Sequence, residues 1–249
     1  VSSILSENPI YRLPYLKKLY ITLKESLNET GADKLFAQIE LPLVRVLAKM
    51  ESVGFALDSD SLIEYGKELL TKMKKCEEEI HSIAGEVFNI NSPKQLGVIL
   101  FEKMGLPILK KKKTGYSTDA ETLEKLRFHS PIIEHILEYR KLAKLYGTYA
   151  EGLLKVTGED GRIRTDFKQT GTLTGRLSSA EPNLQNIPVR TEEGSLLRKF
   201  FISGENKVLI DADYSQIELR ILAHMADDKT MIDAFNSGED IHTITASKV

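Results

Sequence analysis

Residues 208–220, with the sequence VLIDADYSQIELR, constrain the fold of this chain more than any other stretch. They open with an apolar run, Val208 to Ile210, of the kind that a buried strand shows. The run ends in Asp211 and Asp213, which are two residues apart and would therefore lie on one face of that strand. A helical pattern follows, with apolar and charged positions on different sides. The stretch predicts carboxylates at the carboxyl end of a strand, where the chain turns into a helix.

Carboxylates at a strand end suit two kinds of chemistry. Hard divalent cations prefer oxygen ligands, and a phosphate substrate needs its charge neutralised while it reacts. An aspartate in this position can serve both needs. From the spacing alone, an Asp-x-Asp sequence fits a solvated turn or a helix cap equally well, so both alternatives stay open at this point.

The longer string ADYSQIELRILAH, residues 212–224, resembles motif A of the DNA polymerase I family, the family A DNA polymerases. The resemblance implies a palm domain in which Asp213 holds two catalytic Mg²⁺ ions, with Tyr214 as a further metal contact. It also implies that Glu218 takes part in the active site by crowding the ribose 2′ position of the incoming nucleotide. The nucleotide site implied in this way comprises Arg190, Ser215, Gln216, Ile217 and Glu218. Asp211 lies where many relatives carry no acid, and at most it supports the metal ligand indirectly.

The composition is that of a globular protein. The 249 residues are 41% hydrophobic and 28% charged, and the single cysteine, Cys76, suits a reducing cytosol. No apolar stretch reaches the roughly 18 residues of a membrane span. We therefore expect a cytoplasmic protein without a membrane partner. The start at Val1, without a helix cap, favours a piece of a longer protein.

The charge is divided along the chain. Residues 110–199 hold 17 Lys and Arg against 12 Asp and Glu, a net charge of +5. Residues 200–249 hold 4 against 9, a net charge of −5. A basic segment followed by an acidic one fits a phosphate-binding groove beside a metal site, although solvated helix faces give the same tally.

Two long helices are predicted, one ending near Ala84 and one running from Ser130 to about Leu154. The first begins at a cap, Asp58 or Asp60, and its apolar positions alternate spacings of four and three. These positions are Leu62, Gly66, Leu69, Met73, Cys76, Ile80 and Ile83. Because glycine and cysteine weaken such a seam, packing against another helix of the same chain is favoured over a coiled-coil dimer. The resemblance makes these the helices of a polymerase thumb.

A run of four lysines precedes Thr114 and Gly115 in a loop: Lys110, Lys111, Lys112 and Lys113. Ammonium groups this close repel one another unless they are solvated or face an anion, and a solvated loop is the commoner case. The resemblance places the run at the thumb tip, and it matches Arg140 and Lys144 to residues that follow the DNA backbone. These two are four apart and point the same way on a helix. We therefore expect all six to contact phosphates.

A second signature, TGTLTGRLSSAEPNLQNIPVR, occupies residues 170–190 and reads as a loop from its Gly, Ser, Pro and Asn content. A polymerase must hold every base pair equally well. The minor groove offers acceptors in nearly the same places for all pairs. Donors such as Arg176, Asn183 and Gln185 can test that pattern without reading sequence, and the family assigns minor-groove roles to the matching residues. The alternative is an Asx-rich surface loop.

Shorter signals predict several element ends. Pro42 and Gly54 bound one helix, and Ser92-Pro93 and Gly105 bound another. Thr118 with Glu121 predicts a capping box, and residues 162–168 alternate as one strand. Asp227 or Asp228 is expected to cap a helix closed by Gly238, and Asp240 a further helix.

Together these features predict a mostly helical α+β protein with an incomplete polymerase right-hand architecture, thumb helices plus the first half of an antiparallel palm sheet. The expected divisions are an exonuclease-like tail (1–36), palm base (37–56), thumb (57–154), palm with motif A (155–226) and the beginning of the fingers (227–249). The implied partners are primer–template DNA, deoxynucleoside triphosphates and the C-terminal remainder of the polymerase, on the same or a second chain. A non-catalytic primer–template binding module, and a nuclease that pairs Asp211 with Asp213, stay open as alternatives.

Overall fold

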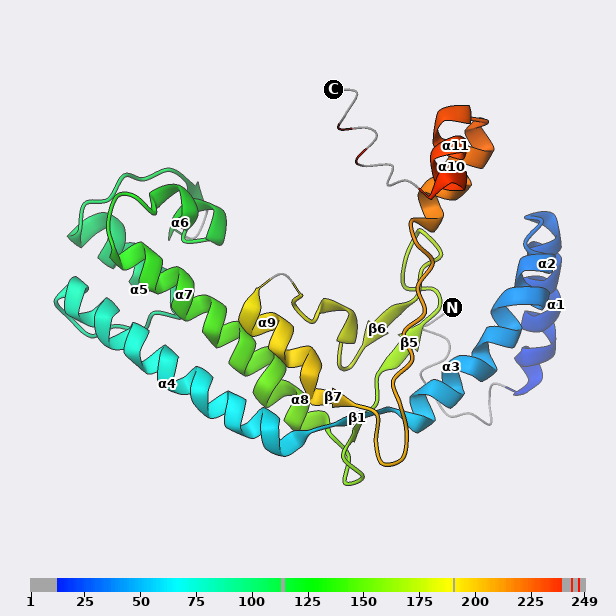
Figure 1. Ribbon diagram of the computed structural model, residues 1–249, viewed down its shortest axis with the longest axis horizontal. Coiled ribbons are helices and arrows are strands. Elements are labelled where there is room, and N and C mark those ends of the chain that lie inside the picture. Colours follow the sequence, from blue (N-terminus) through cyan, green and yellow to red (C-terminus); the bar gives the residue numbers. More distant parts are fainter. Residues whose placement is uncertain (1–12, 113–114, 190, 239–242, 244–245, 247–249) are drawn as a thin grey trace. The chain divides into compact units, whose positions relative to one another are not determined.

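The computed structural model of the chain describes residues 13–112, 115–189, 191–238, 243 and 246 (Figure 1). The chain divides into two compact units, Val1–Glu205 and Asn206–Val249. The expectations for Lys113, for Arg190 and for a helix capped by Asp240 lie outside the described residues.

Helices make up most of the described part of the first unit. The α-helices are α1 Leu13–Glu29, α2 Asp33–Leu35, α3 Leu41–Val53, α4 Ser59–Ala84, α5 Pro93–Gly97, α6 Ala120–Leu126, α7 Ile132–Lys144, α8 Glu151–Val156 and α9 Glu192–Leu197. Three wider, π-helical segments continue them, η3 Phe36–Glu40, η4 Val98–Lys103 and η5 Leu145–Ala150, and two tight 3-10 turns are η6 Leu184–Asn186 and η7 Arg198–Phe200. Among the described helices of the chain, none is both long and apolar enough to cross a lipid bilayer.

The described strands are short and pair antiparallel. β1 Phe55–Leu57 lies between β4 Arg162–Ile163 and β7 Phe201–Ile202, with Phe55 opposite Ile163 and Ala56 opposite Ile202. Two further pairs are β2 Lys111–Lys112 with β3 Gly115–Tyr116, and β5 Asp166–Lys168 with β6 Ser178–Ala180. The expectation of a mostly helical protein with small antiparallel sheets is confirmed.

Most of the predicted helix ends are where the sequence puts them. Asp58 caps α4, where its side chain accepts from the Ser61 amide. Asp228 caps α11 (Lys229–Ser237), where its side chain accepts from the Met231 amide. Gly54 ends α3 with a φ of +62°, a conformation that glycine adopts without a steric penalty. The predicted capping box of Thr118 with Glu121 is wrong. Asp119 caps α6 instead, because its carboxylate accepts from the Thr122 amide at 3.0 Å.

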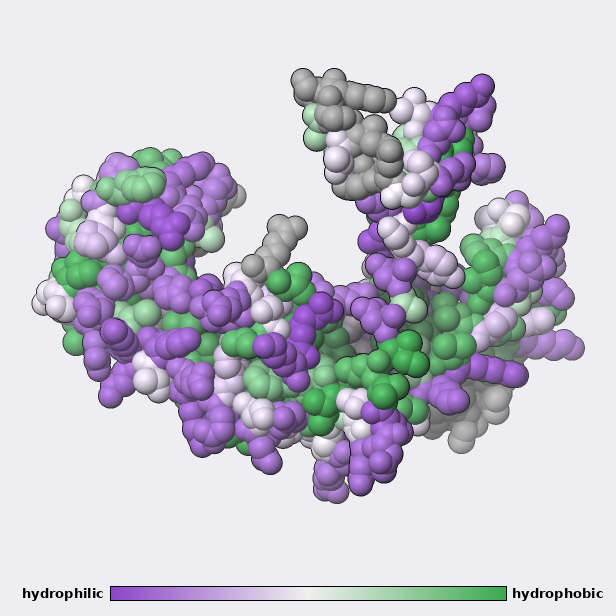
Figure 2. Space-filling model, in the orientation of Figure 1, coloured by the Kyte–Doolittle hydropathy of each residue, from purple (hydrophilic) through white to green (hydrophobic). Residues whose placement is uncertain are grey.

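The long helix α4 packs along α7, as the seam of apolar residues predicts (Figure 1). Leu62 and Leu69 are fully buried and share one core with Leu142 and Leu145. Each fully buried leucine contributes about 1.5–3 kcal/mol relative to an exposed one. Hydrophilic side chains predominate on the face of α4 that Figure 2 shows. The prediction that this helix packs within its own chain is therefore confirmed.

A second core lies at the other end of the same helix pair. Ile80 of α4 is buried there with Leu100, Leu123, Ile133 and Ile136, which bring η4, α6 and the start of α7 together. This core therefore fixes the segment that carries the lysine run, between η4 and α6, at one end of the α4–α7 pair.

The single strand expected over residues 162–168 is instead two strands in different sheets. β4 pairs with β1, whereas β5 pairs with β6. Between them, Thr165 is buried, and its hydroxyl donates to main-chain oxygens of Ala180 and Pro182. The pattern of alternating residues carried no information about this change of partner. The loop expected over 170–190 does contain β6 and η6.

In the second unit, α10 Ile217–Ala226 packs against α11 Lys229–Ser237. The buried strand expected at residues 208–210 is wrong, since this segment is irregular and Val208, Leu209 and Ile210 are 78%, 57% and 87% exposed. A strand needs a neighbouring strand to accept and donate its backbone hydrogen bonds. Among the described residues, no strand pairs with this segment.

Candidate active site and nucleic-acid interface

The two aspartates of the motif lie in the irregular segment that leads into α10. The side chains of Asp211 and Asp213 are both exposed. The chain then turns at Gln216, which is left-handed with φ +52° and ψ +40°. Arg220 stabilises this turn, because its Nε donates to the main-chain oxygen of Ser215 at 2.9 Å. The turn after the carboxylates is thus defined by local contacts, whereas the predicted strand before them is missing.

The expected nucleotide contacts other than Arg190, which lies outside the described residues, are in this turn and at the start of α10. Ser215 and Gln216 form the turn, and Ile217 and Glu218 are the first two residues of the helix. Tyr214, expected beside the metal, is 80% exposed.

The described residues bring together no group of three or more His, Cys, Asp or Glu side chains that could hold a metal ion. Mg²⁺ in phosphate-transferring sites is bound by one or two carboxylates together with waters and substrate phosphates. Asp213 offers one carboxylate of the right chemistry.

Lys111 and Lys112 of the lysine run form β2 of a two-stranded sheet, here called the lysine hairpin, and Lys110 precedes it. β2 and β3 pair with Lys111 opposite Tyr116, and the Ser117 amide donates to the main-chain oxygen of Lys110 at 3.0 Å. The Lys111 ammonium lies 5.7 Å from the centre of the Tyr116 ring, a cation–π contact. The loop expected here therefore contains a strand over Lys111 and Lys112, and of Lys112 the backbone alone is described.

Arg140 and Lys144, expected to act as a pair, differ in their surroundings. Lys144 is exposed. Arg140 is half-buried and donates to both oxygens of Thr118, at 3.3 Å for Thr118 Oγ1. Sequence reasoning missed this contact, because helical spacing shows which residues share a face and not what that face meets.

The side chains expected to read the minor groove lie in a loop with many internal hydrogen bonds. Gln185 donates from Nε2 to the Leu177 main-chain oxygen at 3.1 Å, and its Oε1 accepts from the Ser179 amide at 3.2 Å. Asn183 caps η6, since its Oδ1 accepts from the Gln185 amide. Arg176 is exposed. The amide of Gln185 therefore holds the loop in shape.

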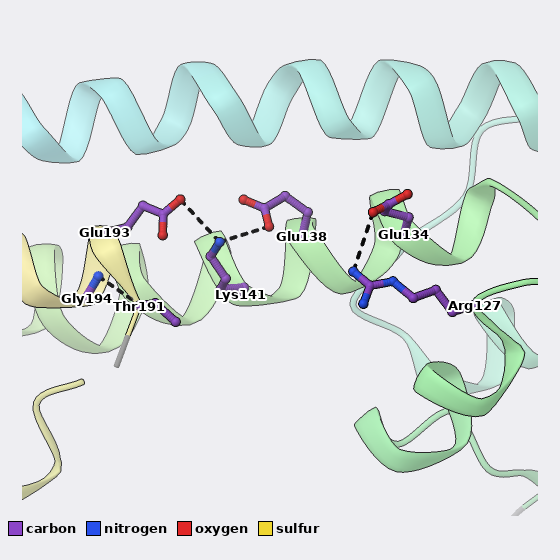
Figure 3. A network of polar contacts seen from close by, with 7 residues as sticks. All are labelled: Arg127, Glu134, Glu138, Lys141, Thr191, Glu193 and Gly194. Atoms are coloured by element: carbon purple, nitrogen blue, oxygen red, sulfur yellow. Dashed lines mark hydrogen bonds and ion pairs between the residues drawn. The ribbon is translucent and has the colours of Figure 1, made fainter. Parts of the chain in front are cut away.

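A network that the sequence analysis missed joins α9, which follows this loop, to the long helices (Figure 3). Lys141 of α7 pairs with Glu138 at 3.0 Å and with Glu193 of α9 at 3.2 Å. The Tyr65 hydroxyl of α4 donates to the main-chain oxygen of Glu193 at 2.7 Å. Burial, together with Glu193 and Glu68, raises the pKa of Tyr65 to about 12, so this donor keeps its proton at neutral pH. The spacing of Lys141 and Glu138 signals only the local pair.

The family model described as DNA polymerase family A matches residues 59–249. The chain belongs to this family. The DNA polymerase I of Caldicellulosiruptor bescii is 50% identical across the whole chain, and that of Bacillus subtilis is 52% identical across 99% of it. This family A chain spans 29% and 28% of the lengths of these two relatives.

A solved structure, the POL domain of Pol1 from M. smegmatis in complex with DNA primer-template and dNTP, is similar to this family A chain. The TM-score is 0.81 at 43% sequence identity, over 90% of this chain and 40% of that one.

Proposed function

We propose that this chain is part of an enzyme that carries out template-directed DNA synthesis, the transfer of a deoxynucleotide to a primer 3′-hydroxyl. The observation that carries the proposal is the similarity to a solved polymerase domain in complex with DNA primer-template and dNTP. Family membership over residues 59–249 supports it. The partners proposed are therefore primer–template DNA, deoxynucleoside triphosphates and the C-terminal remainder of the polymerase.

The proposed architecture follows the ranges expected from the sequence. Residues 57–154, with the α4–α7 pair and the lysine hairpin, form the thumb, and residues 155–226 belong to the palm. Residues 1–36 are the tail of an exonuclease-like domain, 37–56 the palm base and 227–249 the start of the fingers. The test is cross-linking to a primer–template duplex in a protein that joins this chain to the remainder of a family polymerase. Cross-linkers placed in the lysine hairpin and in the 170–190 loop should both reach the duplex.

In this proposal Asp213 supplies one carboxylate to two Mg²⁺ ions, with Tyr214 beside them. Ser215, Gln216, Ile217, Glu218 and Arg190 contact the nucleotide. Bound Mg²⁺ neutralises charge on the reacting phosphate. The ligand assignment is tested by isothermal titration of Mg²⁺ into this chain, joined to the remainder of the polymerase, in the presence of nucleotide. The affinity for Mg²⁺ should fall in the Asp213→Ala variant. The nuclease alternative gains no support, because no further described His, Asp or Glu joins the two aspartates in a metal-binding group.

The isolated 249-residue chain is expected to extend no primer at any Mg²⁺ concentration, because it spans only 29% and 28% of the lengths of the two relatives and the proposed site needs a second carboxylate and the fingers from the remainder. The same chain continued by the corresponding remainder of the Bacillus subtilis relative, here called the completed polymerase, is expected to extend it. Both are measured with a labelled primer on a short template. Extension by the purified chain alone would overturn the proposal that it is an incomplete site.

Glu218→Ala in the completed polymerase is expected to raise ribonucleotide incorporation relative to deoxynucleotide incorporation by about tenfold or more. The proposed contact is between the Glu218 side chain and the ribose 2′-hydroxyl, and a single small group in a binding pocket changes substrate discrimination by about this factor. The ratio of kcat/KM values for matched ribo- and deoxynucleotides measures the effect. Glu218→Gln preserves the side-chain size and serves as the control. If Glu218→Ala left the ratio unchanged, Glu218 would have no such role.

Arg176→Ala in the completed polymerase is expected to lower extension by roughly 10- to 100-fold, the cost of a hydrogen bond from a charged donor. On a primer whose terminal base lacks its N3 or O2 acceptor, the substitution should cost nothing further. Gln185→Ala is the contrast, because its amide holds Leu177 and Ser179, and it should cost the same on every terminus. A uniform penalty for Arg176→Ala as well would remove its minor-groove role.

A further inference from the structure

The lysine hairpin is held at its root by an arginine of α7. Arg140 donates from Nη1 to the main-chain oxygen of Thr118 and from Nη2 to Thr118 Oγ1, the latter at 3.3 Å. Thr118 follows β3 closely and is 5% exposed. A planar guanidinium fixes two acceptors at once, which a point charge on a flexible stem does not do. The contact therefore ties the segment after the hairpin to the long helix in both position and orientation.

The other contacts at the root make the hairpin a continuation of this anchored segment. The Tyr116 ring packs against Phe101, with ring centroids 5.1 Å apart. A Cβ at Gly97 would lie 3.3 Å from the same ring, so the glycine allows α5 to approach it closely. Ser117 is fully buried, and its hydroxyl donates to Asp119 at 2.7 Å. Movement of Thr118 would therefore move the strand on which Lys110 and Lys111 depend.

Arg140 itself is poorly placed to contact DNA. Burial lowers the pKa of its guanidinium, and the nearby Asp119 carboxylate opposes this shift. The guanidinium is thus partly desolvated, and its donors are engaged by Thr118 within the protein. A direct contact with a phosphate would compete with both oxygens of Thr118, whereas Lys144, one turn further along α7, is exposed.

We propose that Arg140 is a positioning residue: it fixes Thr118 on α7 and thereby holds Lys110 and Lys111 where they meet duplex phosphates together. This inference rests on the proposed DNA binding, and it replaces a phosphate contact by Arg140 itself. If it is correct, Arg140 affects duplex binding only when Lys110 and Lys111 are present.

The test measures binding of the 249-residue chain to a labelled primer–template duplex between 50 and 200 mM salt. The quantity compared, called the slope below, is the steepness with which log K falls as log salt rises. Each phosphate contact contributes about 0.9 to it. Arg140→Ala should lower the slope by more than one contact. Arg140→Lys keeps the charge but loses the paired hydrogen bonds to the two oxygens of Thr118, and it should lower the slope nearly as much. In a chain with Lys110→Ser and Lys111→Ser, Arg140→Ala should change the slope no further.

Three further measurements serve as controls. Thr118→Val, which removes one acceptor and no charge, should lower the slope in the same direction, and thermal melting shows whether each variant is folded. Lys144→Ala should lower the slope by about 0.9 in either background, as an independent contact does. A full slope for Arg140→Lys, with a loss of about 0.9 for Arg140→Ala in both backgrounds, would overturn the proposal in favour of direct contact.

Hydrogen exchange at the Ser117 amide separates this inference from the proposed DNA binding. This amide donates to Lys110 across the hairpin, and its exchange should accelerate in Arg140→Ala. If the unsubstituted chain bound no duplex, the proposed DNA binding would fail on its own. Unchanged exchange in a folded Arg140→Ala variant would overturn the positioning role whatever the DNA result.

Discussion

Asp213→Ala is expected to abolish primer extension by the completed polymerase while primer–template affinity stays within a few-fold. A carboxylate that holds a catalytic metal acts on the reacting phosphate, so its loss should cost about a thousandfold or more, about 4 kcal/mol of transition-state stabilisation. Affinity should persist because the proposed phosphate contacts are on other residues of the chain. Single-turnover extension and duplex binding, measured on the same preparation, check the loss of extension and the retained affinity.

Asp211→Ala is the matched control for this result. The two aspartates are both exposed and lie two residues apart in the same irregular segment. If Asp213 alone is a ligand, Asp211→Ala should cost less than about tenfold in extension. Equal losses would instead establish the two as paired ligands, and the assignment of Asp213 as the principal one would be wrong.

Replacing the four lysines of the run, Lys110 to Lys113, by serine is expected to weaken binding to every duplex and to make that binding less dependent on salt. Four lost phosphate contacts would lower the slope by about 3.6, so the variant would lose much less affinity than the wild-type chain between 50 and 200 mM salt. The sequence of the duplex should not matter, because phosphates are the same in every sequence.

A matched control replaces four lysines on α4, Lys67, Lys72, Lys74 and Lys75, by serine. Lys67 already pairs with Glu64 at 2.7 Å. This variant removes the same charge from a surface not proposed to meet DNA, so its slope should change far less. If the hairpin variant kept the full slope, the lysines would be a solvated turn, and equal slopes for both variants would show an effect of net charge alone.

The sequence by itself determined much of this protein because several of its signals act over a few residues. The caps at Asp58 and Asp228 and the end of α3 at Gly54 depend on contacts within one or two helical turns. The seam of α4 is a spacing of apolar residues that repeats over successive turns of one helix, so it can be seen in the sequence before its partner is known. Residues 208–220 and 170–190 carry enough identity to name the family, which the match over residues 59–249 confirms. Competition between neighbouring residues limited even this local information, since Asp119 and not Thr118 caps α6.

Tertiary structure alone decided what each side chain meets. Residues 208–210 have the apolar character of a strand, yet a strand exists only where another supplies its hydrogen bonds, and the described residues supply none. Residues 162–168 divide between two sheets because β1 and β6 each take one half. Arg140 and Lys144 share a helix face by spacing, but one is held by Thr118 and the other is exposed. Contacts between residues far apart in the chain depend on packing, which no local pattern encodes.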